Sequence, residues 1–258
     1  MIEFDPGPPP AFARLFAACP DYKPFKQHFW IDWGPVFYRG RLDGSAKLLC
    51  IASDPGATER IAGRTLVGDA GQRVQGFLAK VGITRTYLCL NAFALGLFPS
   101  HASQADVVLN DPLHLAWRNQ LYDLAKGANV VAILAFGGQA QTAVKLWPGK
   151  GSTPVLNIPH PSSRDEAVLV ARWATAISEL RARVTPDIDG NTALPNYGAQ
   201  FLESDYAPIP RRDLPFGAPQ FLGDDAWRRT AIAPHAGSVS RPTPDDRHTL
   251  IWLAPKTP

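Results

Sequence analysis

Four short apolar segments, separated by stretches of helical periodicity, constrain the fold of this chain more than any other feature. They span residues 46–53, 86–91, 130–136 and 153–158, and none of them repeats with a helical period. Strands that are buried on both faces, as in parallel sheets, have such continuous apolar sequences. Because the strands alternate with helical stretches, we expect an α/β fold, a three-layer α/β/α sandwich with a central four-stranded, mostly parallel sheet.

The helices are expected between and after these strands, at residues 70–81, from about 112, at 138–147 and at about 164–183. Asn110 or Asp111 can cap the second helix, which has Pro112 in its first turn. Two sets of apolar residues share a helical face, and both are expected to be buried: Leu113, Trp117, Leu121 and Leu124 in the second helix, and Trp173, Ile177 and Leu180 in the last. The Gly-rich stretch 56–71 is expected to form a loop up to the start of the first helix.

Charge and proline content divide the chain at about residue 185. The whole chain of 258 residues has a net charge of +3, but residues 1–185 carry +5 and residues 186–258 carry −2 together with 11 of the 25 prolines. We therefore expect an α/β domain over 1–185 and a Pro-rich C-terminal extension over 186–258. Aromatic residues in the extension indicate a strap that packs on the domain, among them Phe201, Tyr206, Phe216, Phe221, Trp227 and Trp252.

Several classes of protein are excluded by composition. No apolar run approaches the roughly 18 residues of a membrane span, and the polar, Pro-rich start does not resemble a signal peptide. The three cysteines, Cys19, Cys50 and Cys89, lack the CxxC spacing of a zinc knuckle or a disulfide framework. His28, His101, His114, His235 and His248 form no metal-binding pattern. We expect a soluble, cytoplasmic protein, monomeric, with no metal and no membrane contact.

Polar residues follow each of the four predicted strands. In parallel sheets ligands bind at the carboxyl ends of the strands. Those ends carry Ser53-Asp54-Pro55-Gly56, Asn91, Gly137-Gly138 and His160-Pro161-Ser162. A carboxylate, a carboxamide and an imidazole are therefore expected on one edge of the sheet.

Each of these residues also has a purely structural interpretation. Asp54 precedes Pro55 and Gly56, which is common in turns, and Asn91 could cap the loop that follows its strand. His160 stands between two prolines that stiffen its loop, although a structural histidine is also possible there. Ser162 and Ser163 could cap the last helix, and Ser163 is the expected cap.

Two nucleotide and hydrolase signatures are absent from the sequence. The chain has no G-x-S-x-G motif, which argues against a serine nucleophile. The Gly-rich stretch 56–71 lacks the spacing and the lysine of a P-loop, which argues against nucleoside triphosphate binding.

Taken together and in order, the segments resemble the uracil-DNA glycosylase superfamily over about residues 46–183. Residues 53–71 resemble the first motif of its thermostable bacterial and archaeal family, P-G-x-x-E followed by G-x-P-F-V-G-x-A-G. Ser53-Asp54-Pro55 instead resembles the uracil-specific family, in which this aspartate activates water. Leu90-Asn91 matches the strand whose asparagine reads uracil, and His160-Pro161-Ser162 matches the H-P-S signature.

The chain also departs from both families, so it resembles a divergent member that mixes their features. The thermostable family carries an iron–sulfur cluster on four cysteines, whereas this chain has three, so no cluster is expected. Leu66 stands where that family has the phenylalanine that stacks on the flipped base. Gly56 replaces the tyrosine that excludes thymine in the uracil-specific family, and Arg164 replaces the leucine that wedges into the duplex.

The resemblance implies hydrolysis of the N-glycosidic bond of uracil in DNA after base flipping, leaving an abasic site. Asp54 and His160 would be catalytic. Asp54 would orient the attacking water, and His160 would donate a hydrogen bond to uracil O2. Asn91 would accept from N3–H and donate to O4, where cytosine reverses donor and acceptor. The remaining candidates fall into two sets: Ser53, Gly56 and Leu66 with Asn91 for the base, and Ser162, Ser163, Arg164 and Gly138 for the DNA.

Two other functions remain open on the same residues. Because Gly56 leaves space, the chain could be a glycosylase for mismatched or deaminated purine bases, such as hypoxanthine or xanthine. Because Gly56 and Leu66 both depart from the families at base-contacting positions, it could also be a non-catalytic member that binds nucleic acid. The base could be covered by Leu66, Phe98 or Phe136.

Overall fold

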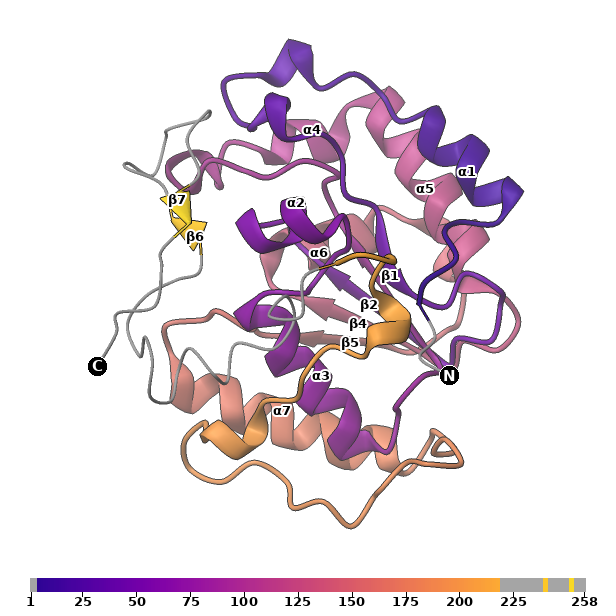
Figure 1. Cartoon of the computed structure of the whole chain (residues 1–258), viewed down its shortest axis with the longest axis vertical. Helices are drawn as coiled ribbons and strands as arrows, with labels where there is room; N and C mark the ends of the chain where they lie inside the picture. The colour runs from indigo at the N-terminus through magenta and orange to yellow at the C-terminus, as the bar shows by residue number, and fades with distance from the viewer. Residues whose placement is uncertain (1–3, 219–238, 241–250, 253–258) are drawn as a thin grey trace.

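A five-stranded sheet forms the centre of the molecule (Figure 1). The structure, a computed structural model, describes residues 4–218, 239–240 and 251–252. The strand order is β1-β3-β2-β4-β5, and all neighbours are parallel except β1 and β3. The strands are β1 (Tyr38–Gly40), β2 (Leu48–Ala52), β3 (Tyr87–Asn91), β4 (Ala132–Phe136) and β5 (Val155–Ile158).

The four predicted strands are confirmed, and the antiparallel edge strand β1 is an addition to them. β1 has only three residues, and a buried arginine, Arg39, lies at its centre. A strand this short with a charged central residue has no apolar pattern, so the sequence did not reveal it. A second pairing joins β6 (Val239–Ser240) to β7 (Ile251–Trp252) outside the main sheet.

Helices cover both faces of the sheet and complete the predicted three layers. In Figure 1, α5 (Pro112–Lys126) and α6 (Gly138–Lys145) lie on one side of the sheet, and α3 (Asp69–Val81) and α7 (Glu166–Arg181) lie on the other. α1 (Pro10–Ala17) packs beside α5. Two separate hydrophobic clusters fill the space between the sheet and these two helical layers. The short helices α2 (Ala57–Ala62) and α4 (Asp106–Asn110) complete the domain.

Three details of the helices differ from the expectations. In α5 the buried face holds Trp117 and Leu121, but Leu113 and Leu124 are exposed. His114, Arg118 and Tyr122 occupy the rest of the buried face. Since a helix advances by about 100° per residue, Leu113 and Leu124 lie at one margin of the predicted face, and the buried face is rotated away from them. The cap of α7 is Asp165, whose side chain accepts from Val168 N, and not Ser163. The Gly-rich stretch contains α2, which was expected to be a loop.

The described part of the extension, residues 186–218, packs against the domain. Tyr197 and Phe201 contact the indole of Trp173 in α7, with ring centroids 5.8 and 6.4 Å apart. Phe216 is exposed but meets Phe4 edge to face. Phe221 and Trp227 lie outside the described residues, and for Trp252 only its place in β7 is described.

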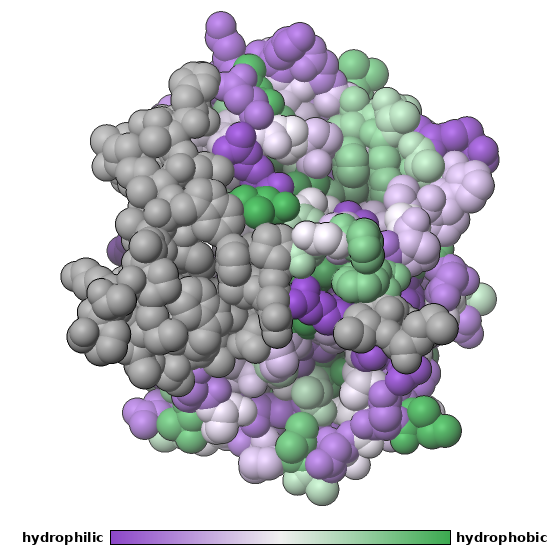
Figure 2. Space-filling view, viewed as in Figure 1, coloured by the Kyte–Doolittle hydropathy of each residue, from purple (hydrophilic) through white to green (hydrophobic). Residues whose placement is uncertain are grey.

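The surface of the described residues is mixed in character. Figure 2 shows hydrophilic residues along the upper and lower margins of one face and a pale hydrophobic area where α1 and α5 lie. Among the described residues, no helix combines the length and the apolar character needed to span a bilayer.

Candidate active site

The carboxyl ends of the four parallel strands form one edge that carries the candidate residues, called here the rim. The register pairs Ala52 in β2 with Asn91 in β3, and Phe136 in β4 with Ile158 in β5. The residues that follow these strands are therefore adjacent. At Gly137 the approach is so close that an added Cβ would lie 2.9 Å from the Cβ of His160. The topology thus brings Asp54, Asn91 and His160 to the same edge, as expected.

Asp54 lies directly after β2 and is partly buried. Its Oδ2 accepts a hydrogen bond from Leu97 N at 2.9 Å, which ties the loop after β3 to the end of β2. Burial raises the pKa of Asp54 to about 6, and the negative charge of Glu59 adds to this rise. Hydrogen bonds from Leu97 and Ser53 act in the opposite direction. At neutral pH the carboxyl group is thus mostly ionised although it is partly buried.

Asn91 is 7% exposed, and neither Oδ1 nor Nδ2 of its side chain has a hydrogen-bond partner among the described residues. Its backbone is fixed, because its carbonyl accepts from the buried Tyr122 hydroxyl at 3.2 Å. A buried polar group without a partner costs about 1–3 kcal/mol. A ligand that supplies both a donor and an acceptor would satisfy both atoms of the carboxamide.

His160 lies after β5 in a loop that several contacts hold in place. Its Nδ1 accepts from Ser162 N at 3.1 Å, so the neutral ring carries its proton on Nε2. Its carbonyl accepts from Ser163 N, the Pro159 carbonyl accepts from Trp173 Nε1, and the Pro161 carbonyl accepts from Arg73. Burial lowers the pKa of His160. The imidazole is therefore neutral at pH 7 and offers one N–H donor.

Leu66 is buried and has a φ of +52°, which is unusual for a residue other than glycine. Its carbonyl leaves no room for a side chain at Gly71, where an added Cβ would lie 1.7 Å away. Leu66 belongs to the same hydrophobic cluster as Ala52 and Phe136. The loop thus places Leu66 in the hydrophobic layer between the sheet and the helices α3 and α7.

The other candidates differ in exposure. Ser53 is buried beside Asp54, and Gly56 is exposed at the start of α2. Ser162 and Arg164 are exposed, Ser163 is half-buried, and Gly138 begins α6 with open space at its Cα. These last four residues border the rim on the side of His160.

The two aromatic candidates for covering a base have separate surroundings. Phe136 is fully buried, and its ring contacts Phe77 and Trp173 in the core. Phe98 packs edge to face on Trp30, which stacks on Trp33 with centroids 4.6 Å apart.

Trp30 and Trp33, which pack with the predicted Phe98, were not among the candidate residues predicted from the sequence. An added Cβ at Gly96 would lie 2.8 Å from the Pro55 carbonyl and 3.2 Å from the Trp33 ring. The indole of Trp33 therefore lies just across Gly96 from the turn that carries Asp54. The only sequence signal was the aromatic density of residues 28–34.

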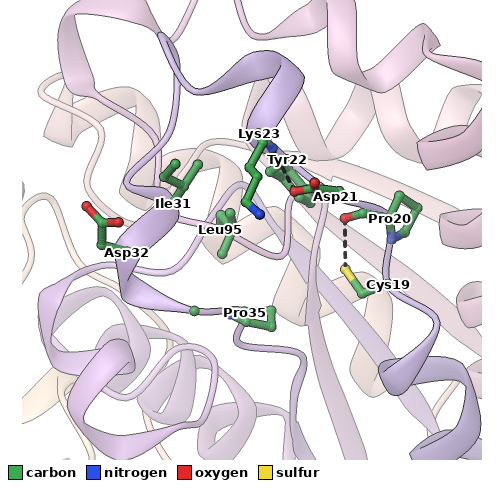
Figure 3. Close-up of a pocket in the computed structure, with 10 residues that line it drawn as sticks. Cys19, Pro20, Asp21, Tyr22, Lys23, Ile31, Asp32, Pro35 and Leu95 are labelled. Carbon is green, nitrogen blue, oxygen red and sulfur yellow. Dashed lines mark hydrogen bonds between the residues drawn. The ribbon is translucent and has the colours of Figure 1, made fainter.

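A cavity of about 280 Å³ lies beside the segment that precedes β1 (Figure 3). It is lined mainly by the segment before β1, including Lys23 and Ile31, and by Leu95. None of the residues predicted for the site lines it.

The cysteines do not fit an iron–sulfur cluster. The chain has three, and such a cluster takes four cysteine ligands. Cys50 and Cys89 are opposite each other in the β2–β3 register and fully buried. Within the described residues, no group of three or more histidine, cysteine or acidic side chains could hold a metal ion.

A family model supplies the decisive comparison. The model of the uracil DNA glycosylase superfamily matches residues 39–173, which is more than half of the chain. The chain belongs to this superfamily of DNA glycosylases. The match includes Asp54, Asn91 and His160 and ends before the extension begins. A search of curated proteins gave no match.

Proposed function

We propose that this superfamily member is a monofunctional uracil-DNA glycosylase, which flips uracil out of DNA and hydrolyses its N-glycosidic bond. The observation that carries the proposal is the buried Asn91 carboxamide without a partner, on the same rim as an ionised aspartate and a neutral histidine. A flipped base presents its Watson–Crick edge to such a pocket.

Asn91 would select the base. With Oδ1 toward N3–H and Nδ2 toward O4, its carboxamide satisfies the edge of uracil. Cytosine offers an acceptor at N3 and a donor at N4, so the same orientation would leave two buried polar groups unpaired. A mismatch of this kind costs a few kcal/mol, which is enough for strong discrimination.

Asp54 and His160 would act on the two charges that develop as the bond breaks. When the C1′–N1 bond breaks, its electron pair stays with uracil, and the sugar gains the character of an oxocarbenium ion. The Asp54 carboxylate would stabilise the sugar, orient the water that adds to C1′ and take up the proton that this water releases. His160 would donate from Nε2 to O2, where the negative charge of the leaving base grows.

The surrounding residues would complete the site. Leu66 would pack on the face of the base, and Ser53 and Gly56 would line the pocket beside Asp54. Ser162, Ser163, Arg164 and Gly138 would contact the DNA backbone next to the flipped nucleotide. Helix starts and serine residues are common phosphate-binding positions, and Arg164 adds a positive charge.

The test is an excision assay with single- and double-stranded oligonucleotides that carry uracil, a thymine mismatch, hypoxanthine or xanthine, followed by alkaline cleavage. The wild-type protein is expected to cleave at uracil, and Asp54→Asn is expected to lower that rate by about a hundredfold or more. The matched control is Asp43→Asn, at an exposed aspartate that bonds Ser45, and it should retain the wild-type rate.

Three results would contradict the proposal. Cleavage at hypoxanthine, xanthine or mismatched thymine but not at uracil would reassign the substrate. Binding without cleavage of any substrate would indicate a non-catalytic member. An Asp54→Asn protein that excises uracil at the wild-type rate would remove Asp54 from the mechanism.

A further inference from the structure

Glu59 in α2 is a buried acidic residue with 8% exposure, and its carboxylate joins two separate segments. Its Oε2 accepts from Gly56 N at 3.1 Å. Its Oε1 accepts from Val67 N and from Gly68 N, both at 2.8 Å. Backbone donors therefore satisfy the negative charge.

In the proposed function these two segments would flank the flipped base. Gly56 ends the turn that carries Asp54, so the Oε2 bond fixes the start of α2 against that turn. Val67 and Gly68 directly follow Leu66, so the Oε1 bonds fix the loop that carries Leu66.

The Leu66 loop has a second set of anchors on its other side. Arg39 Nε donates to the Thr65 carbonyl at 3.1 Å, and Thr65 Oγ1 donates to the Cys89 carbonyl at 3.1 Å. The close approach of Gly71 to the Leu66 carbonyl removes further freedom. The loop is thus attached to the sheet through Thr65 and to the Asp54 turn through Glu59.

We propose that Glu59 is a positioning residue that holds the Asp54 turn and the Leu66 loop at a fixed separation, which sets the width of the base pocket. The inference rests on the proposed function for the identity of the base. A carboxylate suits this task because its two oxygens can accept several backbone N–H groups from different segments at once. A glutamine has a single acceptor oxygen and cannot bond all three.

The chain offers a matched control at the opposite end of the sheet. Asp187 also accepts from three backbone N–H groups, those of Thr84, Arg85 and Thr86 at 2.9, 2.8 and 3.0 Å. These residues precede β3, whereas Asn91 ends it. All three bonds go to Oδ2, so Asp187→Asn removes the charge of a similar carboxylate–backbone cluster, and with it the ion pair to Lys47, without touching the rim.

The experiment compares Glu59→Gln with Asp187→Asn for thermal unfolding and for uracil excision at saturating single-stranded substrate. Both variants are expected to unfold a few degrees below the wild type. Glu59→Gln is expected to lower kcat by about tenfold or more with a smaller change in KM, because a shift of about 1 Å in a pocket wall misplaces the base. Asp187→Asn is expected to keep kcat within about twofold of wild type, since its cluster lies away from the rim.

Amide hydrogen exchange gives a readout that does not depend on activity. In Glu59→Gln the amides of Gly56, Val67 and Gly68 should exchange faster than in the wild type, while those of Thr84–Thr86 should not change. Unchanged exchange at all three amides would overturn the proposal. So would a Glu59→Gln protein whose kcat equals that of Asp187→Asn.

The outcomes separate this inference from the proposed function. If the wild-type protein excises no uracil, the proposed function fails, and amide exchange alone then decides whether Glu59 joins the two segments. If the wild type is active and Glu59→Gln is equally active, the proposed function stands and the role of Glu59 is rejected.

Discussion

At the scale of single residues, burial acts on Asp54 and His160 in opposite directions and leaves both in the state that the proposed reaction needs. It raises the pKa of the Asp54 carboxyl to about 6 and lowers the pKa of the His160 imidazole. At neutral pH the pair is therefore a carboxylate and a neutral ring. The hydrogen bond from Ser162 N to Nδ1 of His160 fixes the tautomer of the neutral ring, with its proton on Nε2.

These pKa shifts predict the pH dependence of excision. The active form has Asp54 ionised and His160 neutral, and burial raises the pKa of Asp54 to about 6, so acid removes activity by protonating Asp54. The single-turnover excision rate should rise between about pH 5 and about pH 7 and then level off. A rate that stays constant down to pH 5 would contradict the assignment of Asp54.

The positions of the main candidate residues could be predicted from the sequence because each lies at or just after the end of an apolar strand. Asp54, Asn91 and His160 lie where parallel topology places ligands. Glu59 and the stacked Trp30–Trp33 pair could not be predicted in the same way. Their contacts depend on how α2 and the segment before β1 fold back toward the rim, which no local spacing records.

At the scale of elements, three aspartates of the extension reach back to cations of the domain. Asp213 in the turn Arg211–Asp213 pairs with Arg39 of β1 at 3.0 Å, and both side chains are essentially inaccessible. Asp205 pairs with Lys80 of α3 at 2.8 Å, and Asp187 pairs with Lys47 before β2 at 3.1 Å. The extension therefore supplies the counter-charge for a buried arginine at the edge of the sheet.

This arrangement predicts a large effect of Asp213→Asn on stability. The substitution leaves the buried Arg39 guanidinium without a full counter-charge and should lower the free energy of unfolding by about 3–5 kcal/mol in urea titrations. Asp189→Asn is the control, because its ion pair with Arg85 is about half exposed and should contribute less than about 1 kcal/mol. Equal losses in the two variants would contradict the role of Asp213.

The sequence predicted the long elements well and the short ones poorly. The strand at 130–136 is a continuous apolar run, and the helix at 70–81 has enough apolar positions to show a helical period. β1 and α2 are too short to show one, and their structure depends on tertiary contacts such as the Arg39 and Glu59 hydrogen bonds. The start of α7 was misplaced because two serines and an aspartate before it are all good caps.

At the scale of the whole molecule, the segment that matches the family model and the segment that folds as one unit end at different residues. The match ends at residue 173, whereas buried ion pairs link residues up to Asp213 to the domain. The charge difference along the sequence, +5 against −2, reflects in part these acidic residues of the extension that meet basic residues of the domain. The proline content of the extension predicted a segment distinct from the domain, but it did not indicate the three ion pairs that Asp187, Asp205 and Asp213 form with the domain.

A truncation tests whether the extension belongs to the folding unit. The chain 1–185 lacks Asp187, Asp205 and Asp213 and is expected to lose cooperative thermal unfolding, because Arg39 is left buried and unpaired. The chain 1–218 retains all three aspartates and is the control. If 1–185 unfolds cooperatively at the same temperature as 1–218, the extension adds nothing to the stability of the domain.

The proposal that the Asn91 carboxamide reads uracil is tested most directly by the variant Asn91→Asp. Its excision rates are measured on single-stranded DNA that contains uracil or cytosine. An ionised aspartate has no donor for uracil O4 but can accept from cytosine N4. The variant should lose uracil excision by about a hundredfold or more and gain measurable cytosine excision. An Asn91→Asp protein that keeps the wild-type rate on uracil and gains none on cytosine would contradict the account.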